Sequence, residues 1–303
     1  MALMRRIDTR IIRSDERSTH MKVAVTGAAG YIGRHVVEKL LEAGHEVVAV
    51  DLFDKGIPEG AKYSPVNIFS GDRDIYDKLG KPDACIHMAW KDGFVHNSAA
   101  HMVNVSDHYK FLCSMIDAGC KRIAVMGTMH EIGFHEGVID EYTPCNPLTL
   151  YGIAKNALRQ ALLLYAKDKD VNIYWLRAYY ILGDDMKNHS VFTKLLEAVE
   201  AGKKTFPFTT GKNKYDFITV DELADQIATA STQDEVTGII NVCTGTAMSL
   251  ADRMEMFIKE HKLDIKLDYG AFPDRPYDSK IVYGDAMKIN EIMRNRDKKR
   301  QLG

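Results

Sequence analysis

Short apolar runs and helical patterns alternate along the first half of the chain. Residues 22–26 form a β-branched run that ends at Gly27, and apolar residues then recur every three or four positions up to Leu41, before Gly44. Further apolar runs predict strands at 46–51, 63–69, 83–90 and 122–128. Because helical or loop material separates these strands, we expect βαβ units with right-handed crossovers. The pattern therefore predicts an α/β fold with a doubly wound parallel sheet that is covered by helices on both faces.

The second half of the chain is less regular. Amphipathic helices are predicted at 191–204 and 249–262, and a strand that runs into a helix is predicted at 215–231. A further strand is predicted at 238–245, and the highly charged tail at 289–303 is expected to be solvated. No repeat or low-complexity linker separates the halves. A second lobe is therefore expected to be interleaved with the first.

The first twenty residues differ from the rest of the chain. They carry five arginines and three acids and lack the apolar core of a secretory signal. A transit peptide is poor in acids, so that interpretation also fails. We expect residues 1–20 to be a leader or tag-like extension outside the fold, with Met21 opening the first strand.

Composition excludes several classes of function. The 303 residues have a formal net charge of −2, which gives no reason to expect a nucleic acid or an anionic membrane as partner. The five cysteines are scattered and include no C-x-x-C pair, as is typical of reduced thiols in a cytoplasmic protein. We therefore expect neither a disulfide framework nor a metal site. No apolar run approaches the roughly 18 residues of a membrane span.

Three glycines at a strand-to-helix turn are the first chemical signal. Gly27, Gly30 and Gly33 permit a tight turn and let the backbone approach a pyrophosphate at the start of a helix. Asp51 closes the second strand, where a carboxylate binds the ribose 2′-hydroxyl of a dinucleotide. This acid favours NAD(H), although Lys55 nearby leaves NADP(H) open.

A tyrosine and a lysine four residues apart are the second signal. If a helix begins near Tyr151, then Lys155 lies one turn further along the same face. An adjacent ammonium favours the phenolate and draws the pKa of the phenol down toward neutral pH, where it can exchange protons. Thr128, at the end of an apolar strand, supplies a third polar group.

The combination resembles the extended short-chain dehydrogenase/reductases of the NAD-dependent epimerase/dehydratase family. The likeness rests on the segments "VAVTGAAGYIG", "IHMAW", "YDFITVDELA", "NVCTG" and "RPYDSKIVYGDAMKI", and it covers nearly everything after Met21. It implies a Rossmann domain formed by 21–178 plus about 215–248, and a smaller, interleaved C-terminal substrate-binding lobe formed by about 179–214 plus 249–303. It also implies a nucleotide-sugar substrate, homodimerisation, and a catalytic triad of Thr128, Tyr151 and Lys155.

The resemblance further implies which residues surround the ligands. The cofactor is expected to contact Gly27, Gly30, Tyr31, Ile32, Gly33, Asp51, Leu52, Asn67, Ile68, Met88, Ala89, Trp90, Tyr151, Lys155 and Tyr179. The sugar nucleotide is expected to contact Trp90, Thr128, His130, Tyr180 and Arg275. The Arg275 guanidinium can pair with diphosphate oxygens, but it can equally pair with Asp274 at the surface. Trp90 fits a core position nearly as well, and His130 fits a loop cap.

The tripeptide Met129-His130-Glu131 narrows the reaction. Dehydratases of this family carry an aspartate-glutamate pair directly after the active-site threonine, because elimination of water needs an acid and a base. Here a methionine occupies the first position, and the histidine-glutamate pair is one residue out of register. On a strand end, a slip of one residue turns a side chain to the opposite face. Dehydration is therefore disfavoured.

Two catalytic functions remain consistent with these residues. A 4-ketoreductase would use NAD(P)H to reduce the 4-keto group of a nucleotide-linked deoxysugar, whereas a 4-epimerase would keep its NAD tightly bound. The short chain, Tyr215 in place of a diphosphate-binding arginine, and Tyr180 in place of an asparagine favour the reductase. A non-catalytic dinucleotide sensor is a lesser alternative, since it would need no proton relay.

Overall fold

The computed structural model describes residues 20–183, 190–274 and 278–302. Seven parallel strands form the central sheet in the order β11-β7-β5-β4-β1-β2-β3. The strands are β1 (Lys22–Thr26), β2 (Glu46–Val50), β3 (Lys62–Ser64), β4 (Ala84–His87), β5 (Arg122–Thr128), β7 (Asn172–Ala178) and β11 (Gly238–Val242). The chain steps outward from β1 in both directions, and the crevice between β1 and β4 is the usual dinucleotide site of such sheets. The predicted α/β fold is confirmed.

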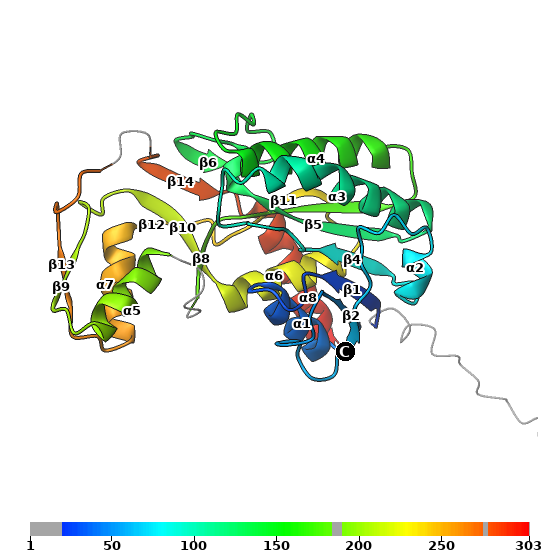
Figure 1. Cartoon of the computed structure of the whole chain (residues 1–303), viewed down its shortest axis with the longest axis horizontal. Coiled ribbons are helices and arrows are strands. Elements are labelled where there is room, and N and C mark those ends of the chain that lie inside the picture. Colours follow the sequence, from blue (N-terminus) through cyan, green and yellow to red (C-terminus); the bar gives the residue numbers. More distant parts are fainter. Residues whose placement is uncertain (1–19, 184–189, 275–277, 303) are drawn as a thin grey trace, which may run out of the picture.

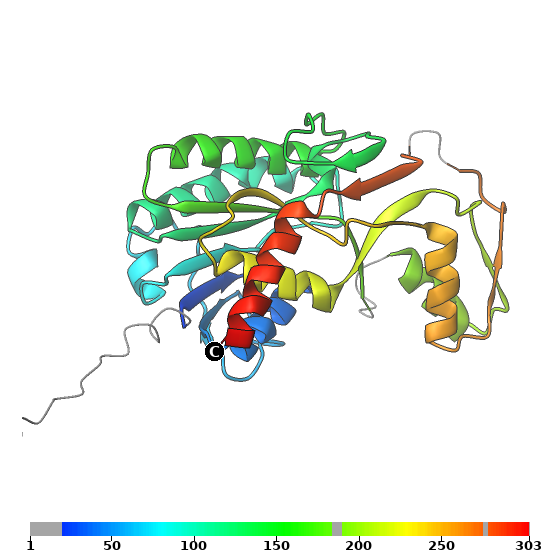
Figure 2. The same ribbon diagram turned by 180° about the vertical axis from the view of Figure 1, so that it is seen from behind.

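Helices cover both faces of this sheet (Figures 1 and 2). One layer consists of α2 (Ile75–Lys78), α3 (Ala100–Asp117) and α4 (Leu150–Ala166); the other consists of α1 (Gly33–Glu42), α6 (Val220–Ser231) and α8 (Met287–Leu302). Consecutive strand residues point to opposite faces, so Val23 and Val25 lie in the core beneath α1 while Ala24 lies in the core beneath α3. Within the described ranges, every helix is too short or too polar to cross a lipid bilayer.

A smaller mixed sheet lies beyond the carboxyl edge of the central one (Figure 1). Its order is β12-β10-β14-β6, and β8 pairs with β10. The strands are β6 (Gly137–Ile139), β8 (Tyr180–Leu182), β10 (Lys214–Thr219), β12 (Ala247–Ser249) and β14 (Ile281–Gly284). Beside it, α5 (Val191–Glu200) and α7 (Leu250–Glu260) enclose a separate apolar core with the parallel pair β9 (Thr205–Pro207) and β13 (Lys266–Asp268).

Two details differ from the sequence prediction. The strand expected at 63–69 is shorter, because β3 spans only Lys62–Ser64. The charged tail expected to be solvated forms α8, which packs against α6 and β11 through the buried side chains of Ile289 and Ile292. This packing places α8 beneath the central sheet rather than in the smaller lobe.

Candidate active site

The glycine turn between β1 and α1 brings the backbone close to the end of β4. Gly27 has φ +73°, and a Cβ atom there would lie 2.7 Å from the amide nitrogen of Ala89. At Gly33 a Cβ atom would lie 2.0 Å from the carbonyl oxygen of Gly27. Ile32 caps α1 without a side-chain hydrogen bond, and the first turn of this helix contains no acid. The helix N-terminus is thus open to an anion, as a pyrophosphate site requires.

Asp51 lies beside this turn. Its carboxylate accepts hydrogen bonds from the N–H of Ala29, at 2.9 Å, and from the N–H of Leu52, at 2.7 Å. The acid and the glycine turn, which are 22 residues apart, are therefore in direct contact. Leu52 is largely exposed at this edge of the sheet. The geometry is that of a ribose-binding acid next to a pyrophosphate turn.

Thr128 ends β5 and caps the short 3₁₀ helix η1 (Met129–Glu131). Its hydroxyl accepts a hydrogen bond from the N–H of His130 at 3.3 Å, and the Glu131 carboxylate accepts one from the N–H of Thr128 at 2.8 Å. This reciprocal capping box fixes the conformation of the strand end. The side chain of Thr128 is buried.

The helix α4 carries Tyr151 and Lys155 past this strand end. A Cβ atom on Gly152 would lie 2.3 Å from the carbonyl oxygen of His130, so the glycine permits α4 to approach η1 closely. Thr149 caps the helix by accepting the N–H of Gly152 at 3.1 Å. The side chain of Thr128 lies close enough to Tyr151 to lower the pKa of its phenol, so two members of the predicted triad lie together.

Lys155 lies deeper than the other two. Its ammonium donates to the carbonyl oxygen of Met126 at 2.7 Å and lies 3.8 Å from the centre of the Trp90 ring. It also lies 5.9 Å from the centre of the Tyr151 ring. The cation is therefore held by an aromatic face and a carbonyl oxygen, two groups that attract a positive charge.

Burial controls the protonation of both groups. Burial lowers the pKa of Lys155 to about 7, while the nearby Glu131 acts in the opposite direction. Burial also raises the pKa of Tyr151, with a further increase from Glu131, and the neighbouring side chain of Thr128 only partly offsets this. The pKa of Tyr151 is therefore raised and not lowered as expected, because the loss of solvation outweighs the stabilisation of the phenolate by the Lys155 cation.

A buried histidine pair supports the wall behind Lys155. Thr26 Oγ1 lies 2.8 Å from His87 Nδ1, and His87 Nε2 lies 2.8 Å from His108 Nδ1. The ring of Trp90 stacks on His108 with a centroid distance of 4.3 Å. Burial lowers the pKa of His108 to about 3, so this pair is neutral near pH 7. It therefore holds Trp90 without placing a second cation beside Lys155.

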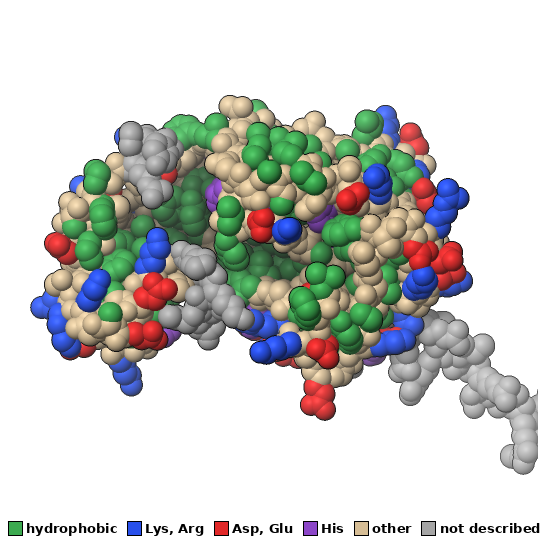
Figure 3. Space-filling view, viewed as in Figure 1, with side chains coloured by type: hydrophobic (Ala, Val, Ile, Leu, Met, Phe, Trp, Pro, Cys, Tyr) green, Lys and Arg blue, Asp and Glu red, His purple; other side chains and the backbone are tan. Residues whose placement is uncertain are grey.

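A cleft of about 790 Å³ lies beside these residues, and its lining includes their neighbours Met129, His130 and Thr149 but none of Thr128, Tyr151 and Lys155. Figure 3 shows the hollow, with hydrophobic side chains along its walls. His130 and Tyr180, two of the predicted sugar contacts, line it together with Tyr215 and Phe217. Burial lowers the pKa of His130 to about 4, so the imidazole is neutral near pH 7. The cleft can thus take a sugar through aromatic faces and neutral hydrogen-bonding groups.

Several predicted contacts lie elsewhere. Tyr179 is buried, and its ring lies against Gly284. Its contact with the cofactor stays a prediction. Ile68 is buried in the core beneath α3, while the side chain of Asn67 accepts the N–H of Phe69 at 3.0 Å. Trp90 is not among the residues that line the cleft.

The remaining predicted residues are distributed as follows. Met88 and Ala89 follow β4 and donate their N–H groups to Thr26 Oγ1 at 3.2 and 3.3 Å, which places both beside the glycine turn. Tyr31, between Gly30 and α1, approaches Gly183, where a Cβ atom would collide with its hydroxyl. Arg275 lies outside the described residues, so its predicted role is not placed in the structure.

Sequence reasoning missed several residues of the cleft, and His96 is the one among them that stacks on Tyr151. His96 stacks on the ring of Tyr151 at a centroid distance of 5.5 Å, and its ring lies 4.4 Å from that of His130. Its carbonyl oxygen also accepts the N–H of Tyr151 at 2.8 Å. The only sequence signal was its place in a loop after a strand end, which many residues share.

Comparison with known proteins places the chain in a family. The profile described as the NAD dependent epimerase/dehydratase family matches residues 23–243. A dTDP-6-deoxy-L-talose 4-dehydrogenase (NAD(+)) from Aggregatibacter actinomycetemcomitans is 45% identical over 87% of this chain and 99% of that protein. A probable UDP-arabinose 4-epimerase from Arabidopsis thaliana is 27% identical over 93% of this chain and 77% of that protein.

A solved structure shares the fold. A UDP-N-acetylglucosamine 4-epimerase from Methanobrevibacter ruminantium M1 superposes with a TM-score of 0.78 at 20% identity, covering 90% of this chain and 92% of that chain. At this identity the likeness concerns the fold alone. The profile match and the 45% identical relative together show that this chain belongs to the NAD-dependent epimerase/dehydratase family of extended short-chain dehydrogenase/reductases.

Proposed function

We propose that this chain is an NAD-dependent oxidoreductase that interconverts the 4-hydroxyl and the 4-keto group of a dTDP-linked 6-deoxyhexose. The observation that carries the proposal is the 45% identity to a dTDP-6-deoxy-L-talose 4-dehydrogenase (NAD(+)), which extends over 99% of that protein. The epimerase named above is more distant, at 27% identity. Reduction of the ketone, which the sequence predicted, is the reverse of the oxidation that the relative's name describes.

The described residues fit a dinucleotide at the crevice between β1 and β4. Gly27 and Gly33 leave the space that a Cβ atom would fill, and the N-terminus of α1 has no side-chain cap. Asp51 would hold the ribose 2′-hydroxyl, where a 2′-phosphate would meet a carboxylate. We expect NAD(H) rather than NADP(H) for this reason. When bound, NAD accepts a hydride from the sugar carbon or returns one to it.

The chain supplies the proton chemistry. Tyr151 would take the proton of the sugar hydroxyl during oxidation and return it during reduction. Thr128, which lies beside Tyr151, would orient the same oxygen. The cation of Lys155, one turn further along α4, would stabilise the phenolate. His96, His130 and Tyr180 would contact the sugar from the walls of the cleft.

Absorbance at 340 nm tests the proposal directly. Purified protein with dTDP-6-deoxy-L-talose and NAD⁺ should produce NADH in proportion to the sugar oxidised, and the 4-keto product with NADH should reverse the signal. NADP⁺ should be a much poorer oxidant, because of Asp51. Interconversion of two 4-epimers without a change at 340 nm would contradict the proposal and favour the epimerase.

We also propose that the protein forms a homodimer through α3 and α4. These neighbouring helices expose apolar side chains, among them Val103 and Leu164 at 71% and 74% exposure. Light scattering after gel filtration should give the mass of two chains, and Leu164→Glu should give that of one. Leu302→Glu, at an exposed site on α8, is the matched control and should remain dimeric. A monomeric wild type would contradict this proposal.

A further inference from the structure

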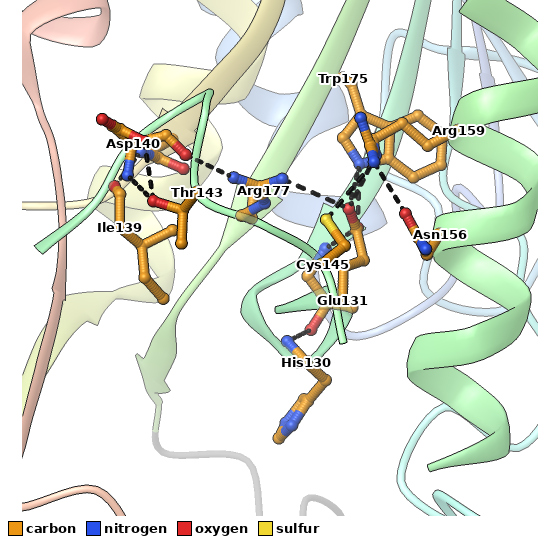
Figure 4. A network of polar contacts seen from close by, with 12 residues as sticks. His130, Glu131, Ile139, Asp140, Thr143, Cys145, Asn156, Arg159, Trp175 and Arg177 are labelled. Carbon is orange, nitrogen blue, oxygen red and sulfur yellow. Dashed lines mark hydrogen bonds and ion pairs between the residues drawn. The ribbon is translucent and has the colours of Figure 1, made fainter. Parts of the chain in front are cut away.

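Glu131 is a fully buried carboxylate directly behind the predicted triad. Its Oε1 accepts the N–H of Thr128 at 2.8 Å and the indole N–H of Trp175 at 2.9 Å. Figure 4 shows the carboxylate pointing into the protein, toward Trp175 and the arginines, whereas the side chain of His130 points the other way. A buried charge is costly unless neighbouring groups compensate it, so partners of this carboxylate are expected around the strand end.

Two guanidinium groups compensate the charge. Arg177 Nη2 lies 3.7 Å and Arg159 Nε lies 3.5 Å from Glu131 Oε2. Arg177 also donates to the carbonyl oxygen of Asp140 at 3.1 Å, and so ties the segment directly after β6 of the smaller sheet to the same centre. The contacts come from β7 and α4, so three elements converge on one carboxylate.

A glycine makes room for this arrangement. A Cβ atom on Gly127 would lie 2.3 Å from Trp175 Nε1 and 2.9 Å from Glu131 Oε1. The residue before Thr128 must therefore lack a side chain if the indole and the carboxylate are to meet beneath the strand. The backbone of β5 and the buried carboxylate thus depend on each other for their positions.

The charge of the Glu131 carboxylate also acts on the proton-transfer groups of α4. Its negative charge raises the pKa of Tyr151 and also that of Lys155. The other charged groups facing Glu131 are Arg159 on α4 and Arg177 on β7. His130, its neighbour on η1, has a pKa lowered to about 4 by burial and is therefore neutral near pH 7.

We propose that Glu131 is a positioning residue of the active site: by accepting the N–H of Thr128 it fixes Thr128 at the strand end beside Tyr151, and its negative charge sets the pH range in which Tyr151 and Lys155 exchange protons. This inference rests on the proposed function, because it assigns a role within that reaction. It differs from the acid-base role that a glutamate after the threonine has in dehydratases. Glu131 is fully buried and faces away from the cleft, so it acts through Thr128 and through its charge.

The test compares Glu131→Gln with the wild type in sugar oxidation by NAD⁺ across pH. Glutamine keeps an acceptor for the N–H of Thr128 but removes the charge. We expect the pH profile of kcat to move toward lower pH by about 1 unit, because both groups lose a proton more easily without a neighbouring anion. Glu141→Gln is the matched control, since its carboxylate pairs with Lys288 away from the triad. Its profile should coincide with that of the wild type.

A purely structural role predicts a different result. In that case Glu131→Gln would lower kcat without moving the profile, and this outcome would overturn the charge assignment. Glu131→Asp tests the positioning, and it also serves if the glutamine variant fails to fold. Aspartate keeps the charge but is one methylene too short to reach the N–H of Thr128, so we expect kcat to fall at least 10-fold with an unmoved profile. A kcat equal to that of the wild type would overturn the positioning.

Failure of the proposed function is recognised separately. A wild-type protein that oxidises no dTDP-linked sugar contradicts that function and leaves the geometry of Thr128 to be decided by crystal structures of the wild type and Glu131→Asp. Displacement of Thr128 Oγ1 from Tyr151 in the variant would support the inference. An unchanged Thr128 would overturn it, whatever the substrate is.

Discussion

Gly33→Ala is predicted to weaken cofactor binding through steric overlap alone. Gly33 is not at positive φ, so alanine causes no backbone strain there, and the single added atom is the whole perturbation. That atom would lie 2.0 Å from the carbonyl oxygen of Gly27, about 1 Å inside the 3.0 Å that real Cβ contacts respect. The start of α1 must therefore move away from β1 by about that amount.

The displacement has two measurable consequences. The N–H groups that would face the pyrophosphate move with α1, and a misplacement of about 1 Å costs roughly 100-fold in a positioned site. We expect NADH to bind at least 10-fold more weakly, which corresponds to about 1.4 kcal/mol. Overpacking should also lower the free energy of unfolding by about 1–3 kcal/mol.

Isothermal titration with NADH and thermal unfolding measure these two effects. Gly93→Ala is the matched control, because Gly93 is also outside the positive-φ region and nothing lies within 4 Å of its added Cβ atom. It should bind NADH as the wild type does. If Gly33→Ala binds NADH with the wild-type Kd, the assignment of the pyrophosphate to this turn is refuted.

Three further predictions concern the groups on and above α4. Tyr151→Phe should abolish sugar oxidation while NADH binding stays near normal, because only the proton-transfer hydroxyl is lost; turnover at the wild-type rate would exclude Tyr151 as the acid-base group. Lys155→Met should remove a pH dependence of folding. The folded protein releases this proton near pH 7, whereas the free side chain holds it to 10.5, so the unfolded state binds more protons in between and wild-type stability should rise from pH 7 to 9 relative to the variant. Parallel Tm curves would contradict the lowered pKa. His96→Ala should raise KM for the sugar about 10-fold with NADH affinity unchanged, since a side chain of this cleft wall is lost, whereas His135→Ala, outside the lining, should leave KM unchanged.

Most of the predictions from the sequence rest on patterns among residues that are close together in the chain. The strand, glycine turn and helix from 22 to 42 follow from β-branched residues and helical spacing over adjacent positions, and β1 and α1 have these bounds within a few residues. Lys155 lies on the same face as Tyr151, because four-residue spacing in a helix is a local property. Their catalytic roles remain predictions that the experiments above test.

Contacts between residues far apart in the chain could not be predicted from the sequence, for a physical reason. The stacking of His96 on Tyr151 joins residues 55 positions apart, and neither local pattern encodes the other. The tail from Met287 to Leu302 shows the same limit. Its composition is charged, yet Ile289 and Ile292, three positions apart, suffice to bury one stripe beneath α6. Only two of the sixteen residues are buried apolar side chains, and this is too weak a periodic signal to predict a docked helix.

The Met129-His130-Glu131 segment shows how register and burial together decide chemistry. The sequence indicated that the histidine-glutamate pair is one residue out of register for water elimination, and the structure gives each side chain a separate direction. His130 lines the cleft, whereas Glu131 is fully buried beneath the strand end with Trp175 and two arginines. A carboxylate enclosed in this way can neither protonate a leaving hydroxyl nor remove a proton from a sugar carbon. Glu131 can therefore act on a bound sugar only indirectly, through its hydrogen bond with the N–H of Thr128 and through the electric field of its charge at Tyr151. The two positions directly after Thr128 thus hold no carboxylate, and transfer of a hydride with proton exchange at Tyr151 is the chemistry that this strand end favours.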